Sequence, residues 1–258
     1  MILPKISIVI PSYNKVRYIK KTLDSIFDQK YENLEVIIQD GGSTDGSLEI
    51  IKNYLNKYPK ITKLESKKDN GQLDAINKGL KKVTGDIVTF INADDMYENE
   101  AFKTIANYYI ENPNALWFVG KGIVVNNKDI EIVKLATIYK NLLLFKNKYN
   151  ILLTTNYLMQ PSVFLIKKAY EKYGPFMGTN DFVMEYDLWL KIGKNKMPVT
   201  INKNLSKFRI EKSTKTKRLF NEILKKDEEI IKKYSSNKFI FILHKLHNIG
   251  RILIGNFI

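Results

Sequence analysis

The chain has 258 residues, 44% of them hydrophobic, so it is long enough to form one large domain with an apolar core. It has no cysteine, which excludes disulfide bonds, thiolate metal ligands and a cysteine nucleophile. The net charge of +15 comes almost entirely from lysine and suits an acidic substrate, an anionic lipid surface or nucleic acid.

The first residues lead directly into a predicted strand, without the basic and apolar regions of a secretory signal peptide. No uncharged apolar run reaches the length of about 18 residues that a membrane span needs. We therefore expect a cytoplasmic protein. The basic C-terminal region leaves open a peripheral attachment to the inner face of the plasma membrane.

Short apolar runs alternate with segments of helical periodicity over the first hundred residues. Strands are predicted at residues 5–11, 34–38, 61–64 and 87–91, and helices follow the first three of them. This alternation, with its short loops, predicts an α/β fold in which helices flank a Rossmann-like, mostly parallel central sheet.

Three of these strands end in polar clusters, at residues 12–14, 39–45 and 92–95. The carboxyl ends of parallel strands meet at one edge, where open α/β sheets bind ligands. Asp94 and Asp95 offer hard oxygen ligands that suit Mg²⁺ or Mn²⁺ holding a diphosphate. Alternatively, Asp94 caps the following helix. Neither GxGxxG nor GxxxxGK[ST] follows the first strand, which argues against a dinucleotide site or a P-loop.

The second half of the chain predicts a mixed sheet region. Further strands are expected at residues 116–125, 130–135, 161–166 and 199–205, the first two forming a hairpin, and helices at residues 102–110, 167–173 and 183–192. Two basic helical segments, residues 219–231 and 239–258, follow. They either lie on an anionic membrane surface or pack on the domain.

Six sequence blocks, in this order, resemble the family 2 glycosyltransferases, which have the GT-A fold. The blocks are SIVIPSYN (7–14), VIIQDGGSTDGS (36–47), DNGQLDAINKGLKKVTGD (69–86), INADDMY (91–97), QPSVF (160–164) and MEYDLWLKI (184–192). The resemblance implies a catalytic domain at residues 1–210 and a basic helical extension at 211–258. Within the domain, residues 1–97 would bind the nucleotide and residues 98–210 would form the acceptor side.

The resemblance also implies a nucleotide site in the first loops. Pro11, Tyr13 and Asn14 would line the base and ribose pocket, and Asp40 would accept a hydrogen bond from the uracil N–H. Asp74 matches a residue that completes the nucleoside site, although a surface carboxylate on a helix is the alternative.

Asn92-Ala93-Asp94 resembles the DXD motif of the family, with asparagine at the first position. Asp94 is the expected metal ligand, and Asp95 would bind the metal or the sugar hydroxyls. Bound Mn²⁺ or Mg²⁺ would offset the charge of the departing diphosphate. Arg209 matches a segment that contacts the diphosphate or the metal, with Glu211 where relatives carry histidine.

Glu185 stands where relatives carry the aspartate that acts as general base, and Asp187 is either the base or a structural acid. The resemblance thus implies an inverting, metal-dependent glycosyltransferase of bacterial polysaccharide assembly. Its donor would be a nucleotide-sugar, with UDP-sugar as the default, and its acceptor a saccharide or lipid-linked hydroxyl.

Other functions remain open at this point. A nucleotidyltransferase would use a similar carboxylate and metal site without a base at Glu185. A catalytically silent member would bind only a membrane or a partner protein. No nucleic-acid recognition motif accompanies the positive charge, so nucleic acid is not an expected partner.

Overall fold

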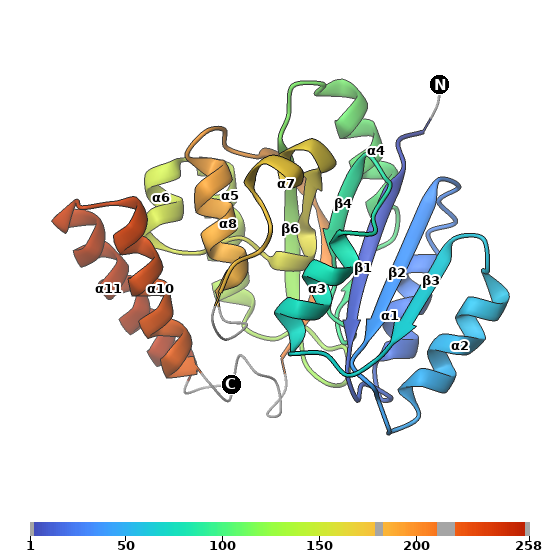
Figure 1. Cartoon of the computed structure of the whole chain (residues 1–258). Coiled ribbons are helices and arrows are strands. Elements are labelled where there is room, and N and C mark those ends of the chain that lie inside the picture. Colours follow the sequence, from blue (N-terminus) through green and yellow to red (C-terminus); the bar gives the residue numbers. More distant parts are fainter. Residues whose placement is uncertain (1–2, 179–182, 211–219, 256–258) are drawn as a thin grey trace.

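The computed structural model describes residues 3–178, 183–210 and 220–255. These residues form an eight-stranded sheet with helices on both faces and two C-terminal helices at one end (Figure 1). The strand order is β3-β2-β1-β4-β7-β6-β8-β5. The predicted α/β architecture, a mostly parallel sheet flanked by helices, is confirmed.

Four parallel strands form the first part of the sheet. They are β1 (Ile6–Ser12), β2 (Leu34–Asp40), β3 (Thr62–Ser66) and β4 (Ile87–Phe90). Every residue of β1, β2 and β4 is buried because helices cover both faces, and such strands appear in the sequence as nearly continuous apolar runs. Their carboxyl ends lie together at the lower side of Figure 1.

The other four strands make the sheet mixed. They are β5 (Met96–Tyr97), β6 (Trp117–Val125), β7 (Val163–Ile166), which follows the short helix η1 (Gln160–Ser162), and β8 (Val199–Arg209). β7 is antiparallel to both β4 and β6, whereas β8 is parallel to β6 and antiparallel to β5.

The strand predicted at residues 130–135 is wrong. A single bridge joins Val125 to Glu131, and the helix α5 (Lys134–Lys146) then begins. The apolar residues Leu135, Ile138 and Leu142 follow a helical spacing that outweighs the short apolar run before it.

The helices beside the sheet divide the core into two clusters. α1 (Ile19–Phe27), α2 (Ser47–Lys57) and α4 (Ala101–Glu111) cover one face. α3 (Gln72–Leu80), α7 (Lys167–Tyr173) and α8 (Met184–Gly193) cover the other. A Cβ on Gly79 of α3 would lie 2.3 Å from Cγ1 of Val9, so only glycine allows α3 to approach β1 this closely.

Four helices gather at the left-hand end of Figure 1: α5, α6 (Tyr149–Thr154), α10 (Phe220–Tyr234) and α11 (Lys238–Gly255). α10 buries Leu224, Ile230 and Ile231, so it packs on the domain. The predicted domain boundary, between residues 210 and 211, adjoins a segment outside the described residues. Among the helices of the described ranges, none is long and apolar enough to cross a membrane.

Candidate active site

The three polar clusters meet at the carboxyl edge of the parallel strands, as predicted. The backbone N–H of Asn14 donates to Oγ of Ser43 (2.9 Å), and the N–H of Thr44 donates to Oδ1 of Asn14 (2.9 Å). These two bonds join the loops after β1 and β2. Nζ of Lys15 forms an ion pair with the carboxylate of Asp94, which joins the loop after β1 to the loop after β4.

Asp40 lies at the end of β2 with only 1% of its surface exposed. Its carboxylate accepts hydrogen bonds from the backbone N–H groups of Gly42 (3.1 Å) and Ser43 (3.0 Å). It also accepts from the hydroxyls of Ser43 (2.5 Å) and Ser66 (2.6 Å). Asp40 therefore organises the turn after β2, where Gly42 adopts a φ of +85°. Its contact with a nucleobase stays a prediction.

Tyr13 is 61% exposed, whereas Pro11 is buried at the end of β1. A Cβ on Gly41 would lie 3.3 Å from Cδ2 of Tyr13 and 3.0 Å from Oδ2 of Asp69. The ring of Tyr13 and the carboxylate of Asp69 thus lie on either side of the backbone at Gly41, which carries no side chain. A planar ligand could stack on the exposed ring there. Asp69 was not among the residues predicted for this site, although it lies in the polar turn before α3.

Asp74 lies in the first turn of α3, as predicted from the sequence. It pairs with Lys78 one turn later (2.7 Å) and accepts a hydrogen bond from the N–H of Asn70 (3.0 Å). These two hydrogen bonds lower the pKa of Asp74. The placement is that of a surface carboxylate near a helix N-terminus. A role in nucleoside binding stays a prediction.

Asp94 does not cap the following helix, so that alternative is wrong. α4 begins at Ala101 after the N-cap residue Glu100, and Asp94 instead pairs with Lys15. Pairing with Lys15 could not be predicted from the sequence, since the two residues are 79 positions apart. The only sequence signal for Lys15 is its position directly after Asn14, in the loop that closes the first strand.

Asn92 and Asp95 hold the loop that presents Asp94. Oδ1 of Asn92 accepts from Nε2 of Gln72 (2.6 Å), and Nδ2 of Asn92 donates to Asp95 (3.1 Å). Asp95 is 1% exposed and also accepts from the backbone N–H of Arg209 (2.8 Å). Its burial, together with the charge of Asp94, raises the pKa of Asp95 well above its usual range. Asp95 therefore supports the loop from inside.

The side chain of Arg209 is fully buried beneath this loop. Its Nε donates to the carbonyl oxygen of Asp94 (2.9 Å), and its Nη1 donates to that of Asn126 (2.6 Å). Its Nη2 donates to Asp129 (2.5 Å), and the guanidinium lies 4.6 Å from the ring centre of Tyr18. These contacts make Arg209 a clamp that positions Asp94. Its contact with a diphosphate stays a prediction.

The donor set around Asp94 suits a metal ion that is shared with a ligand. Within the described ranges, no group of three His, Asp or Glu side chains could hold a metal by itself. Asp94 is 8% exposed at the sheet edge, and its carboxylate faces a cation, the ammonium of Lys15. Mg²⁺ is often held by one or two carboxylates plus substrate phosphates. The residues present fit Mg²⁺ or Mn²⁺ bound in that way.

Glu185 and Asp187 lie in the first turn of α8. Asp187 accepts a hydrogen bond from the hydroxyl of Tyr234 (3.2 Å) and lies 3.4 Å from Nζ of Lys233. These contacts tie α8 to α10 and give Asp187 a structural role. Glu185 is half-buried. Tyr186, between them, donates to the carbonyl oxygen of Leu152 (2.6 Å), which anchors the turn that carries both acids.

The chain has an α/β fold with three polar loops gathered at the carboxyl edge of its parallel strands, and comparison with known proteins gives the family. The family model for glycosyl transferase family 2 matches residues 7–174, which is more than half of the chain. The chain belongs to this family.

Curated relatives agree. The chain is 37% identical over 112 residues to an uncharacterised glycosyltransferase of Haemophilus influenzae, covering 43% of this chain and 45% of that protein. It is 30% identical over 124 residues to the putative teichuronic acid biosynthesis glycosyltransferase TuaG of Bacillus subtilis, covering 48% and 49%. The chain thus spans less than half the length of these two relatives.

Solved structures share the fold. Mannosyltransferase PcManGT from Pyrobaculum calidifontis, in complex with GDP-Man and Mn²⁺, superposes with a TM-score of 0.70. It is 19% identical and covers 95% of this chain and 69% of its own. S. aureus TarS 1-349, in complex with UDP-GlcNAc, gives a TM-score of 0.63 at 18% identity and covers 90% and 68%. The fold is therefore GT-A-like, with a curled mixed sheet and C-terminal helices.

Proposed function

We propose that this protein is an inverting, metal-dependent glycosyltransferase. It transfers a sugar from a nucleotide-sugar, with UDP-sugar as the first choice, to a hydroxyl of a saccharide or lipid-linked acceptor in surface polysaccharide assembly. The observation that carries the proposal is the meeting of the loops after β1, β2 and β4, which carry the exposed ring of Tyr13, the Asp40 turn and Asp94. The donors in TarS and PcManGT, and the teichuronic acid assignment of TuaG, support the class.

In the proposed donor complex, the base stacks on Tyr13 beside the turn that Asp40 organises. The diphosphate lies near Asp94 and Lys15. Bound Mn²⁺ or Mg²⁺ supplies positive charge where the departing diphosphate gathers negative charge. Lys15 turns from Asp94 to a phosphate oxygen, because a lysine ammonium binds phosphate as a point charge. Arg209 and Asp95 hold the Asp94 loop in place from below.

In the proposed transfer step, Glu185 accepts the proton of the acceptor hydroxyl. The hydroxyl oxygen forms a bond to the anomeric carbon, and the bond from that carbon to the diphosphate oxygen breaks. The proton remains on Glu185, and the electron pair leaves with the nucleoside diphosphate. Attack from the side opposite the leaving group inverts the anomeric configuration. No nucleophilic side chain is required.

Calorimetric titration with UDP tests the donor site. Wild type and Asp94→Ala are titrated in Mn²⁺ and in EDTA, with Glu49→Ala on the exposed side of α2 as the control. We expect metal-dependent binding that Asp94→Ala loses and the control keeps. Binding of GDP but not UDP would change only the nucleotide of the proposed donor and would leave the proposed glycosyltransferase function standing. If UDP, GDP and dTDP all fail to bind with either metal, the proposed function is wrong.

A further inference from the structure

Two helices present apolar side chains to solvent. On α5 and α11, ten large hydrophobic residues are between 40% and 84% exposed. They form what we call the α5–α11 face: Leu135, Ile138, Tyr139, Leu142 and Phe145 of α5, and Phe239, Ile242, Leu246, Ile249 and Ile252 of α11. Monomeric soluble proteins rarely expose so many apolar side chains on adjoining elements, and such surfaces mark interaction sites.

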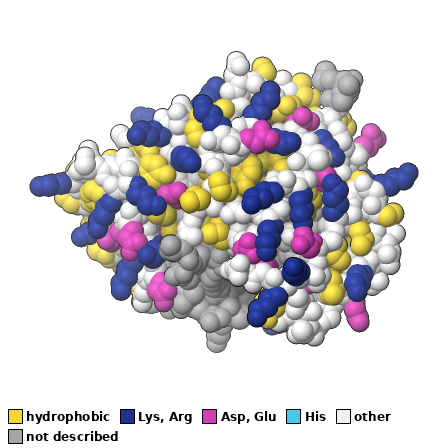
Figure 2. Space-filling model, viewed as in Figure 1, with side chains coloured by type: hydrophobic (Ala, Val, Ile, Leu, Met, Phe, Trp, Pro, Cys, Tyr) yellow, Lys and Arg dark blue, Asp and Glu magenta, His cyan; other side chains and the backbone are white. Residues whose placement is uncertain are grey.

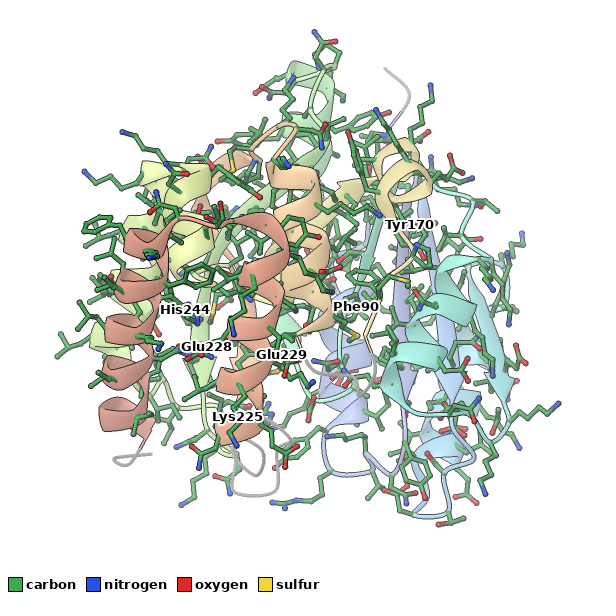
Figure 3. All side chains as sticks on the ribbon, turned by 60° about the vertical axis from the view of Figure 1, so that its left-hand side comes forward. Phe90, Tyr170, Lys225, Glu228, Glu229 and His244 are labelled. Atoms are coloured by element: carbon green, nitrogen blue, oxygen red, sulfur yellow. The ribbon has the colours of Figure 1, made fainter. Side chains whose placement is uncertain are left out.

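Besides Ile240, which joins the core, α11 buries polar side chains where a surface helix normally buries apolar ones. His244 and Asn248 are 1% and 6% exposed, and His244 lies between α11 and α10 in Figure 3. Nδ1–H of His244 donates to the carbonyl oxygen of Thr154 (2.9 Å), and Nε2 accepts from Nδ2 of Asn248 (2.9 Å). Arg251 then joins Asn248 (3.1 Å) to Asp227 of α10 (2.5 Å). The polar side of α11 is thus fixed against the domain, and its apolar side faces outward.

α5 packs Leu144 into the core but also turns a row of apolar side chains to solvent. It buries Thr137 and Leu144, whereas its residues at i, i+3, i+7 and i+10 from Leu135 face solvent. The rings of Tyr139 and His247 stack at 5.8 Å, which joins the exposed sides of α5 and α11 into one surface. A helix whose polar side is satisfied within the protein and whose apolar side is open suits the boundary between water and lipid.

The charges on these two helices are all positive. Neither α5 nor α11 contains Asp or Glu, and together they carry five lysines and one arginine: Lys134, Lys140, Lys146, Lys238, Lys245 and Arg251. Over the face shown in Figure 2, lysine and arginine are spread broadly, and hydrophobic side chains appear among them over α11 at its left-hand end. Arg251 pairs with the buried Asp227, and Lys140 lies beside that pair, where burial lowers the pKa of Lys140. The exposed cations are therefore Lys134, Lys146, Lys238 and Lys245. A second copy of the chain would bring these lysines against one another, whereas anionic lipid headgroups complement them.

We propose that the α5–α11 face docks the protein on an anionic lipid bilayer, with the apolar side chains at the acyl boundary and the lysines at the headgroups. Both C-terminal helices were predicted either to lie on an anionic membrane surface or to pack on the domain. α10 packs on the domain core, and α5, for which no helix was predicted, lies beside α11. The proposal does not depend on the identity of the donor or the acceptor.

Co-sedimentation of the full chain with lipid vesicles tests the proposal. The vesicles are phosphatidylcholine alone, or phosphatidylcholine with about one third phosphatidylglycerol, which supplies the anionic surface. Leu142→Gln with Leu246→Gln removes apolar contacts from each helix, and Lys146→Glu with Lys245→Glu reverses two charges. The matched controls are Ile110→Gln with Leu3→Gln, and Lys52→Glu with Lys103→Glu, all at exposed positions away from the face.

We expect wild type to sediment with the anionic vesicles only, and to be released as salt rises. Each face variant should bind at least about tenfold more weakly, and both controls should bind like wild type. The proposal is overturned if wild type stays in solution, or if the face variants bind as the controls do. Self-association in sedimentation velocity that the face variants abolish, without vesicle binding, would instead assign the face to a second copy. Circular dichroism checks that each variant is folded.

Discussion

Lys15 and Asp94 form an ion pair that joins the loops after β1 and β4. If Asp94 holds the metal ion as proposed, Lys15 and the metal compete for the same carboxylate. Replacing Lys15 by methionine therefore has opposite effects on two ligands. Mn²⁺ alone should bind more tightly, because Asp94 is no longer paired. UDP in the presence of Mn²⁺ should bind more weakly, on the order of tenfold, because a phosphate-binding cation is lost. Calorimetry measures both, with Lys52→Met as the control. Equal effects on the two ligands would contradict this role.

Replacing Glu185 and replacing Asp187, the two acids of α8, should have different effects on kcat and on stability. Glu185→Gln should lower kcat by about 10²- to 10⁴-fold with donor binding unchanged, since it removes a general base. Asp187→Asn should lower kcat far less and reduce the free energy of unfolding, because Asp187 holds Tyr234 and Lys233 of α10. Steady-state kinetics and urea unfolding of both variants measure the difference. If Asp187→Asn lowers kcat more than Glu185→Gln does, Asp187 is the base.

Arg209 is expected to matter for stability as well as for activity. Arg209→Met leaves the carbonyl oxygen of Asp94 without this donor and removes one of the donors to Asp129 and to the carbonyl oxygen of Asn126. Asp129 keeps its ion pair with Lys21, and the carbonyl oxygen of Asn126 keeps the N–H of Asp129. The free energy of unfolding should fall by about 3 kcal/mol, the lower end of the range for breaking a buried ion pair. Arg209→Lys should recover only part of the lost free energy of unfolding, since lysine lacks the planar guanidinium group that donates several hydrogen bonds at once. Arg17→Met, on the exposed side of the same region, should cost less than about 0.5 kcal/mol.

Glu35 on β2 should make the stability of the protein depend on acid pH. Burial raises the pKa of Glu35, but hydrogen bonds from Lys63 (2.8 Å), the hydroxyl of Ser7 (2.6 Å) and the N–H of Thr84 (2.8 Å) outweigh burial and lower it to about 2. Because the folded value lies below the unfolded value of 4.5, the stabilisation is present above about pH 4.5 and is lost as the pH falls towards 2.

The size of this contribution is about 3 kcal/mol, since each unit of pKa shift corresponds to about 1.4 kcal/mol. Urea unfolding at several pH values should show that Glu35→Gln destabilises the protein at pH 7 and has a much smaller effect near pH 2. Glu49→Gln, at an exposed position on α2, should show the same dependence of stability on pH as wild type. If the free energies of unfolding of Glu35→Gln and wild type differ by the same amount at pH 7 and near pH 2, the lowered pKa of Glu35 is wrong.

His244 should be neutral and protonated on Nδ1, because that nitrogen faces the carbonyl oxygen of Thr154. Burial lowers the pKa of His244 below 6.5, opposed by the nearby acids Asp227 and Glu228 of α10 and assisted by Arg251. The folded chain should therefore lose stability as the pH falls below about 6.5. Long-range ¹⁵N–¹H spectra measure both the tautomer and the titration. The chain has two histidines, so His247→Gln assigns the signals. Protonation on Nε2 would contradict the hydrogen-bond chain.

The sequence predicts the parallel half of the sheet well, because buried strands such as β1 and β4 are uninterrupted apolar runs. α7 has the predicted bounds because the helix ends at the Gly174-Pro175 pair. β5 could not be predicted, since its two residues are a strand only through pairing with β8. α5 was not predicted, because the short apolar run at residues 130–135 was interpreted as a strand and the helical spacing of the apolar residues after it was not recognised.

The meeting of the polar loops was predictable, because parallel strands bring their carboxyl ends to one edge. The pairing of particular side chains within that edge was not. Arg209 reaches Asp94 across 115 positions of sequence, and no local pattern shows that its guanidinium would bond to the loops that carry Asp94 and Asn126. Asp94 and Asp95 likewise differ in burial and in partners although their chemistry is identical. The metal-binding role predicted for both stays a prediction.

The Arg209 clamp has a consequence for how the protein is made. A ribosome completes residues 1–97 well before it reaches the end of β8. Until then Asp95 lacks the N–H that it accepts from, and the loop bearing Asp94 has no guanidinium beneath it. The loop that carries Asp94 thus cannot reach this arrangement until β8 has emerged from the ribosome. The nascent protein completes this edge of the sheet only when β8, about a hundred residues later in the sequence, inserts between β6 and β5.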